Sequence, residues 1–315
     1  MSENIQPNDL PQAWSRLGLR VDAQEWPASA LYVVATPIGN LGDLSLRAWQ
    51  TLSRATIIAA EDTRSTRILL DAWGIATPLM ASHRHNEAAA AQAIVQRLQA
   101  GERVALVSDA GSPAVSDPGA RVVAAVIEAG FRVIPLPGAS ALITALMAAG
   151  VTDDEHPEFI FAGFAPNKAM ARQKWFKYWC SFGASVAFYE APHRINASLK
   201  DLCAVAGPER RVTLARELTK RFEQICTMTL GETASWIQAD AHREQGEFVV
   251  IIHPLAQAAT QSLSGDGEMA AIDAWIDAML PLVSVRDIAK IIAQATSLKR
   301  DAVYARALTR KGESD

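Results

Sequence analysis

Short apolar runs alternate with longer amphipathic segments over the first half of the chain, from Leu31 to about Gly150. The runs consist mainly of Val, Ile, Ala and Leu and predict strands at Leu31–Ala35, Thr56–Ala60, Arg103–Val107 and Arg132–Leu136. The longer segments predict helices at Ser45–Ser53, Thr63–Trp73, Asn86–Ala100, Asp117–Gly130 and Ser140–Ala149. Strands that are apolar on both faces are typical of a parallel sheet covered by helices. This half is therefore predicted to be an α/β domain.

The second half, which follows the acidic segment "VTDDEHPE", mixes strands and helices less regularly. It predicts strands at Phe159–Ala162, Ser185–Tyr189, Arg211–Glu217, Gln224–Leu230 and Glu247–Ile252. The predicted helices are Ala169–Ser181, Pro192–Ala206 and Glu232–Gln238. Because two strands follow one another without a helix between them, some pairing is expected to be antiparallel. The pattern indicates a second α/β domain with a mixed sheet.

Composition changes mark the limits of these domains. We expect a flexible N-terminal extension over residues 1–29 with at most a short helix, then α/β domains over 30–152 and 153–255. An Ala-, Gln-, Ser- and Gly-rich segment, Leu255–Gly267, is typical of a tether. A helical tail is predicted over 268–315, with helices at Glu268–Met279 and Val285–Thr296 and a last one to about Thr309.

Composition narrows the class of protein without naming a function. The net charge is −4, so no global basic field indicates a nucleic-acid partner. Three widely spaced cysteines suggest neither a disulfide framework nor a zinc site. No apolar run approaches the ~18 residues that span a bilayer, and the N-terminus lacks the features of a signal peptide. We expect a cytoplasmic protein without a membrane partner.

Three turns rich in small residues follow predicted strands. The first holds Pro37, Gly39 and Gly42 but lacks the three-glycine dinucleotide fingerprint and the phosphate loop, which favours a cofactor without a pyrophosphate. Alternatively, its glycines only shape a corner. The second is "SDAGSPAVSDPG", and the third contains Gly138 and Ala139. Ligands of open α/β sheets bind at the carboxyl ends of strands, so we expect one ligand crevice here.

Two aspartates in the second turn receive different interpretations. Asp109 is suited to bind an ammonium group or a ribose hydroxyl, or else it only closes an Asx turn. Asp117, followed by Pro118, is interpreted as the N-cap of the next helix.

Seven segments in order resemble the tetrapyrrole methylase superfamily of S-adenosylmethionine methyltransferases, which have two α/β domains with the cofactor cleft between them. Within it they are most similar to the branch that methylates the 2′-oxygen of a cytidine in 16S ribosomal RNA. The segments are "TPIGNLGDLS", "AAEDTR", "HNE", "VSDAGSPAVSDPG", "PLPGASA", "FYEAPHR" and "ARELTK". The resemblance covers about Leu31 to Ile252, and the basic helical tail fits the same branch. Residues before Leu31 lie outside it.

The resemblance implies S-adenosylmethionine as the cofactor, a homodimer and a 16S rRNA substrate in the small ribosomal subunit. It implies cofactor contacts from Pro37, Gly39, Ser108, Asp109, Ala110, Gly111, Val115, Gly138, Ala139, Tyr189, Leu214, Ala215 and Glu247. Members that methylate tetrapyrroles carry a G-x-G-x-G-D type first loop. This chain has "PIGNLGD" instead, which counts against a porphyrinoid substrate.

Methyl transfer to a ribose hydroxyl benefits from a general base or a positioned cation. Glu61, Asp62 and Arg64 follow a buried strand at the same sheet edge, with Thr63 as the expected helix N-cap. The two acids are candidate catalytic groups, or else they only favour the helix N-terminus. Glu217 and Lys220 follow another strand and are candidate bases, between which the sequence does not choose.

Basic residues are concentrated locally. From Phe159 to Leu230 eleven basic residues face five acidic ones, a net of +6, with aromatic residues interleaved in "RQKWFKYW". From Ser284 to Lys311 the count is seven against two, a net of +5. Such surfaces suit a structured RNA, although a solvated helix gives the same pattern. Candidate RNA contacts are Arg64, Lys168, Arg172, Lys174, Arg194, Arg216, Arg221, Arg286, Lys299 and Arg300.

Other functions fit the same sequence less well. His83, His85 and Glu87 have poor spacing for a metal, so none is expected, and His193 is interpreted as a surface histidine. A small tetrapyrrole-like substrate, or a ribosome-binding factor without turnover, remain alternatives. The general base, the oligomeric state and the ribosome-facing surface do not follow from the residues.

Overall fold

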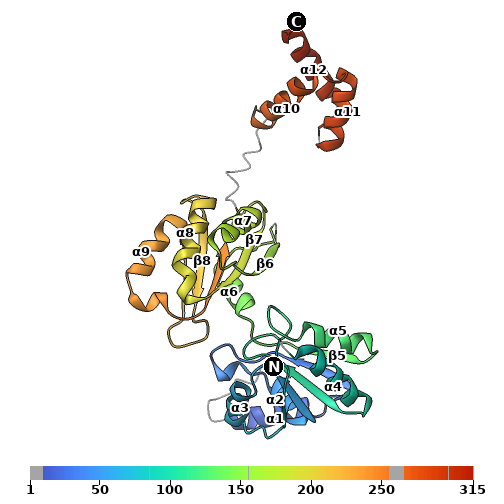
Figure 1. The fold of residues 1–315 in the computed structure, drawn as a ribbon, viewed down its shortest axis with the longest axis vertical. Helices are drawn as coiled ribbons and strands as arrows, with labels where there is room; N and C mark the ends of the chain where they lie inside the picture. Colours follow the sequence, from blue (N-terminus) through green and yellow to red (C-terminus); the bar gives the residue numbers. More distant parts are fainter. Residues whose placement is uncertain (1–9, 85, 155, 255–265, 297, 315) are drawn as a thin grey trace, which may run out of the picture. The chain divides into compact units, whose positions relative to one another are not determined.

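The computed structural model describes residues 10–84, 86–154, 156–254, 266–296 and 298–314. The chain divides into two compact units, Met1–Pro254 and Leu255–Asp315 (Figure 1). Among the described residues, the first unit contains two five-stranded sheets, and the second consists of three helices.

The first sheet is parallel throughout, with the strand order β3-β2-β4-β1-β5. Its strands are β1 (Ala30–Val34), β2 (Ile57–Ala60), β3 (Leu79–Ala81), β4 (Arg103–Val107) and β5 (Arg132–Leu136). Helices α2 (Leu46–Arg54) and α3 (Thr63–Ala72) pack on one face, and α4 (Glu87–Gln99) and α5 (Ala120–Glu128) pack on the other. Every residue of β2 is buried, as its wholly apolar sequence predicts.

Two features of this region differ from the expectation. Strand β3 was not predicted, because three half-exposed residues carry too little pattern. Residues 10–29 are not a flexible extension: helix α1 (Leu10–Asp22) packs against α2, and the Gln50 side chain donates a 3.1 Å hydrogen bond to the Gly18 carbonyl. The hydroxyl of Tyr32 also donates to the Pro27 carbonyl, 2.8 Å away.

The second sheet is mixed, with the order β6-β7-β10-β8-β9. Strands β6 (Phe159–Phe164) and β7 (Ser185–Glu190) are parallel, whereas β10 (Phe248–Ile252) is antiparallel to β7 and to β8 (Arg211–Arg216), and β9 (Gln224–Thr229) is antiparallel to β8. Helices α7 (Ala169–Trp179), α8 (Ile195–Ala206) and α9 (Thr233–Gln238) cover one face. Short 3-10 turns lie at Leu41–Asp43, Pro192–Arg194, Leu230–Glu232 and Ala241–Glu244.

Helix α6 (Ala141–Ala149) follows the last strand of the first sheet but packs on the second. Its Leu142, Ala145 and Ala149 are buried against Ala187 and Val249, on the face that α7 and α8 leave open. The helix sequence is apolar nearly throughout, yet only one face is buried, since Ile143 and Met147 are exposed. This packing ties the two sheets into one unit.

The second unit consists of α10 (Asp266–Met279), α11 (Val285–Ala295) and α12 (Arg300–Ser314). Its small core contains Ile276, Ile288, Ile292 and Val303. The Ser284 hydroxyl accepts a hydrogen bond from the backbone N–H of Asp287 and so caps the N-terminus of α11. No helix in the part of the chain that the structure describes is long and apolar enough to cross a membrane.

A buried histidine makes the stability of the first unit depend on pH. The His253 ring lies 2.8 Å from the Thr213 hydroxyl, and burial, with help from Arg211 and Arg210, lowers the pKa of His253 to about 4. Because the unfolded chain binds a proton near pH 6.5 and the folded chain does not, the free energy of unfolding should fall as pH drops from about 6.5 toward 4, by at most about 3 kcal/mol.

Thermal unfolding of the wild-type protein and of His253→Gln over this pH range measures the effect. Glutamine keeps a partner for Thr213 but does not titrate, so the melting temperature of the variant should fall less. Parallel curves for the two proteins would contradict the assignment.

Candidate functional site

Three loops meet at the carboxyl edge of the first sheet. Thr36, after β1, and Gly111, after β4, exchange two backbone hydrogen bonds of 2.9 Å. The Ser112 hydroxyl donates to the carbonyl of Ala139, which follows β5, over 3.3 Å. The three turns that the sequence predicts to form one crevice are therefore joined to one another.

Small residues are required where these loops cross. A Cβ on Gly138 would lie 2.9 Å from the Cβ of Ala35, and Gly111 has a φ of +78°, which side chains rarely adopt. Gly111 is buried and bonded to Thr36, whereas the neighbouring residues Asp109, Ala110 and Gly138 are exposed at the edge. A ligand with several polar groups is able to approach the backbone closely there.

Carboxylates gather along the same edge. The Asp109 carboxylate accepts a 3.0 Å hydrogen bond from the backbone N–H of Asp62. Burial, followed by the charges of Asp109 and Asp117, raises the pKa of Glu61, and burial also raises that of Asp117. The acids repel one another, so a bound cation or a hydrogen-bond donor would relieve this repulsion.

The structure corrects the interpretation of Asp117. Helix α5 begins at Ala120, and its N-cap is Gly119. The Glu87 carboxylate performs the capping, because it accepts hydrogen bonds from the backbone of Gly119 (2.8 Å) and Arg121 (3.2 Å). Asp117 instead bonds the side chain of Ser108, within the crevice.

This arrangement depends on a loop that folds back on itself. Ala114 and Ser116 both have left-handed backbones, with φ of 67° and 62°. No local sequence pattern predicted this capping of α5, because Glu87 belongs to α4.

The N-cap of α3 is Asp62 and not Thr63, which the sequence suggested. Asp62 is the N-cap of α3 and pairs with Arg64, whose side chain is 90% exposed. Hydrogen bonds from the Arg64 side chain and backbone lower the pKa of Asp62 to about 2. A carboxylate that is so weakly basic and already bonded is a poor general base, so the structure argues against this candidate.

A second charged group lies at the end of β8 in the other half of the unit. The Lys220 ammonium lies 2.9 Å from the Glu217 carboxylate and 3.2 Å from that of Glu247. Burial alone would lower the pKa of Lys220, but hydrogen bonds to Glu217 and Glu247 outweigh it and raise that pKa. For Glu217, burial alone would raise the pKa, but the hydrogen bond from Lys220 outweighs burial and lowers that pKa. Both groups are therefore charged at neutral pH, and neither is poised as a base.

The backbone around this ion pair is strained. Glu217 and Thr219 have φ of 51° and 65°, a conformation that costs energy outside glycine. Gly246 makes room for the Glu217 side chain, because an added Cβ would lie 2.4 Å from its Cγ.

Lys220 also joins the two halves of the site. Its Cγ would lie 2.3 Å from a Cβ added to Gly39, so the lysine stem packs directly on the first glycine turn. The carbonyl of Leu218 would lie 3.2 Å from the same Cβ. The loop after β8 therefore contacts the first of the three turns, and Gly39 permits the contact.

Aromatic rings cluster on β6 and β7 of the second sheet. The Tyr189 ring packs edge-on against Phe161 and Phe164, with centroids 4.9 and 5.3 Å away. Burial raises the pKa of Tyr189, so its hydroxyl stays protonated. The two phenylalanines were not predicted, since they depend on a bulge in β6 around Gly163.

The remaining predicted cofactor residues occupy varied settings. Leu214 and Ala215 are fully buried within β8, which pairs with β10 on one side and β9 on the other, whereas Val115 is exposed. Pro37 is half-buried beside Thr36 in the first turn.

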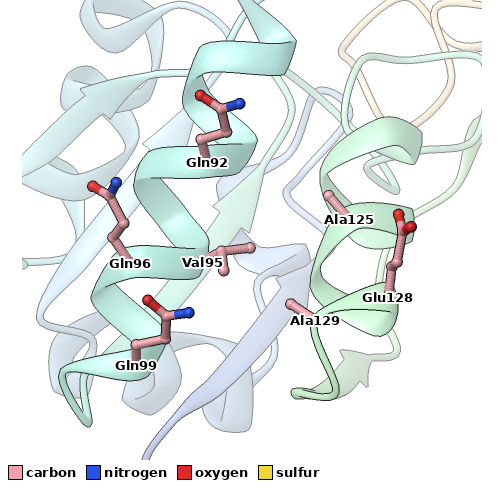
Figure 2. A pocket seen from close by; sticks show the side chains of 7 residues that line it. All are labelled: Gln92, Val95, Gln96, Gln99, Ala125, Glu128 and Ala129. Atoms are coloured by element: carbon pink, nitrogen blue, oxygen red, sulfur yellow. The ribbon is translucent and has the colours of Figure 1, made fainter.

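The groove shown in Figure 2 is a different feature. It lies between α4 and α5 and is lined by Gln92, Val95, Gln96, Gln99, Ala125, Glu128 and Ala129. Gln99 and Ala129 stand just before β4 and β5 in the chain, so the groove is at the amino edge of the sheet. It is therefore separate from the three loops at the opposite edge.

Three of the predicted RNA contacts are engaged inside the protein. Arg172 is 4% exposed and pairs with Asp201, and Arg216 is 3% exposed and donates to the carbonyls of His242 and Gln245. Arg194 pairs with Glu190 at 3.1 Å. These arginines stabilise the fold, which corrects the prediction for Arg172 and Arg216. The exposed members of the set are Arg64, Lys168, Lys174, Arg221, Arg286, Lys299 and Arg300.

The edge suits a cationic cofactor, because it combines small-residue loops with clustered carboxylates. No set of three His, Cys, Asp or Glu residues within the described ranges is arranged to hold a metal ion. His85, part of the metal alternative, lies outside those ranges.

Comparisons with known proteins agree with this geometry. The family described as Tetrapyrrole (Corrin/Porphyrin) Methylases matches residues 30–234, and the RsmI C-terminal HTH domain matches residues 266–311. The chain is 42% identical to the ribosomal RNA small subunit methyltransferase I of Pseudomonas aeruginosa, over 91% of this chain and 99% of that protein. It is 44% identical to the protein of the same name from Neisseria meningitidis serogroup B, over 90% and 94%.

Solved structures share the fold at much lower identity. A cobalt precorrin-4 methyltransferase matches with a TM-score of 0.53 and 14% identity, over 71% of this chain and 94% of that one. A uroporphyrin-III C-methyltransferase from Thermus thermophilus, complexed with S-adenosyl homocysteine, matches with a TM-score of 0.50 and 15% identity, over 70% and 96%. The predicted fold class is confirmed, and the chain belongs to the tetrapyrrole methylase family and, within it, to the ribosomal RNA small subunit methyltransferase I group.

Proposed function

We propose that the protein transfers the methyl group of S-adenosylmethionine to the ribose 2′-oxygen of cytidine 1402 in the 16S rRNA of the small ribosomal subunit. The observation that carries the proposal is similarity at 42% identity over 91% of the chain to a ribosomal RNA small subunit methyltransferase. The joined loops at the carboxyl edge support it. A cytoplasmic location and a homodimer belong to the same proposal.

S-adenosylmethionine supplies an activated methyl group on a positively charged sulfur. Backbone groups from Ser108 to Gly111, with Gly138 and Ala139, would hold the amino-acid and nucleoside parts. The carboxylates of Asp109 and Asp117 favour a cationic ligand electrostatically. Tyr189 and the buried backbone of Leu214 and Ala215 would close the site from the second sheet.

The transfer forms one O–C bond and breaks one C–S bond, and the hydroxyl proton must leave the ribose. Glu61 is a better acceptor for this proton than Asp62, because its pKa is raised rather than lowered. Lys220, as a fixed cation held by Glu217 and Glu247, is suited to orient a ribose oxygen or a phosphate. In this scheme Glu217 holds Lys220 and does not act as the base.

The reaction is tested by supplying the full-length protein with labelled S-adenosylmethionine and small subunits from cells that lack it. Nuclease digestion and mass spectrometry should identify 2′-O-methylcytidine at one position. Subunit binding without product would favour a non-catalytic factor. Transfer to a tetrapyrrole but not to subunits would favour the small-substrate alternative.

Gly39→Ala should slow methyl transfer about 10- to 100-fold, because the new Cβ must displace Lys220 from the cofactor turn. Gly183→Ala is the matched control, since nothing lies within 4 Å of its added Cβ and its backbone is not left-handed. Initial rates and melting temperatures should be measured for both variants. Equal rates would show that the contact of Lys220 with Gly39 has no part in the reaction.

Arg172→Ala and Lys174→Ala separate stability from RNA affinity on one helix. Removing the buried Arg172 leaves the Asp201 carboxylate without its ion pair and with the hydrogen bond from Gln173, so the free energy of unfolding should fall by about 3 kcal/mol. Lys174 is exposed, so its loss should leave the melting temperature unchanged and weaken RNA binding slightly. Melting curves and filter binding to 16S rRNA measure both. An Arg172→Ala protein of normal stability would contradict the structural role.

A further inference from the structure

The C-terminal unit separates its charges between helices. Helix α10 contains four acids and no Lys or Arg, whereas α11 and α12, with the turn before α12, carry all seven basic residues of the tail. Two of the seven bind α10: Arg306 pairs with Asp273 (2.6 Å) and Arg310 pairs with Asp277. These pairs fix the side of α12 that faces α10.

Another side of α12, next to the buried one, carries a stripe of exposed residues. Arg300, Tyr304, Leu308 and Lys311 recur every three or four residues, which places them on one helix face. Tyr304 is 41% exposed and Leu308 is 48% exposed, while Val303 and Ala307 on the inner side are buried. The stripe therefore has a cation near each end and an exposed aromatic ring between them.

Neighbouring charges reinforce this surface. Lys299 precedes the stripe, and Arg286 and Lys290 are exposed one turn apart on α11. Between Arg286 and Lys311 the exposed acids are Asp287, which the Ser284 hydroxyl already binds at 2.6 Å, and Asp301. Five exposed cations against two acids leave a local net of +3.

We infer that the α12 stripe binds ribosomal RNA, with the Tyr304 ring stacked on an unpaired base and with Arg300 and Lys311 on flanking phosphates. The inference rests on the proposed function, because it assumes an RNA substrate. A basic face with an exposed aromatic ring is complementary to single-stranded segments of a folded RNA. From Arg300 to Lys311 the helix rises about 16 Å, the length of a few stacked nucleotides. A second copy of the same face would be repelled by its like charge.

The test uses the full-length protein and filter binding to unmodified 16S rRNA at several salt concentrations. Tyr304→Ala should weaken binding about tenfold, and Tyr304→Phe should retain most of the affinity, since the ring is kept. Arg300→Ala should weaken binding and reduce the slope of log affinity against log salt by about one. Trp275→Ala is the matched control, because Trp275 is a 51% exposed aromatic residue on the acidic helix.

The possible outcomes separate this inference from the proposed function. If the wild-type protein methylates subunits but the Tyr304 and Arg300 variants bind RNA as tightly as it does, the inference is wrong and the proposed function stands. An altered oligomeric state of the variants would assign the stripe to contact with a second copy. A slower reaction at unchanged RNA affinity would assign it to contact with the chain's own α/β unit. Either result would overturn the inference. If Tyr304→Ala fails to fold, Arg300→Ala and its salt dependence still decide. Absence of methyl transfer by the wild-type protein would instead refute the proposed function.

Discussion

The packing of α6 against the second sheet is the constraint on which the candidate site depends. Leu142, Ala145 and Ala149 exchange water for contact with a sheet face that no other described helix covers. The loop that enters α6 contains Gly138 and Ala139, so burying the helix also fixes one of the three turns. The contact of Lys220 with Gly39 then joins the other side of the edge. Site geometry is thus a consequence of core packing.

Electrostatics at this edge are arranged in two different ways. Glu61, Asp109 and Asp117 are close together with little compensation, and the raised pKa values of Glu61 and Asp117 reflect that cost. Glu217 and Glu247 instead share Lys220, and the hydrogen bond from Lys220 outweighs burial to lower the pKa of Glu217. A protein that binds a sulfonium benefits from the first arrangement, because the ligand brings the missing positive charge. The second arrangement supplies a fixed cation without a strong base.

Basic residues that look alike in the sequence have unlike roles in the structure. Arg172 and Lys174 are two positions apart on α7, yet one is buried against Asp201 and the other is exposed. On α12, Arg306 pairs with Asp273 whereas Arg300 is exposed. Guanidinium groups form such internal pairs readily, because their planar donors match a carboxylate. Local net charge therefore overstates the surface available to RNA.

The sequence by itself determined the α/β class, nearly all strands, and the three turns at one sheet edge, because apolar periodicity and glycine positions are local properties. It also determined the family, through seven ordered segments. Only the tertiary structure decided that α1 belongs to the folded unit, that Glu87 rather than Asp117 caps α5, and that Asp62 rather than Thr63 caps α3. It also decided which arginines are buried. Except for the cap at Asp62, which bonds Arg64 two residues on, these outcomes depend on partners tens of residues away, and no local pattern encodes a contact between distant positions.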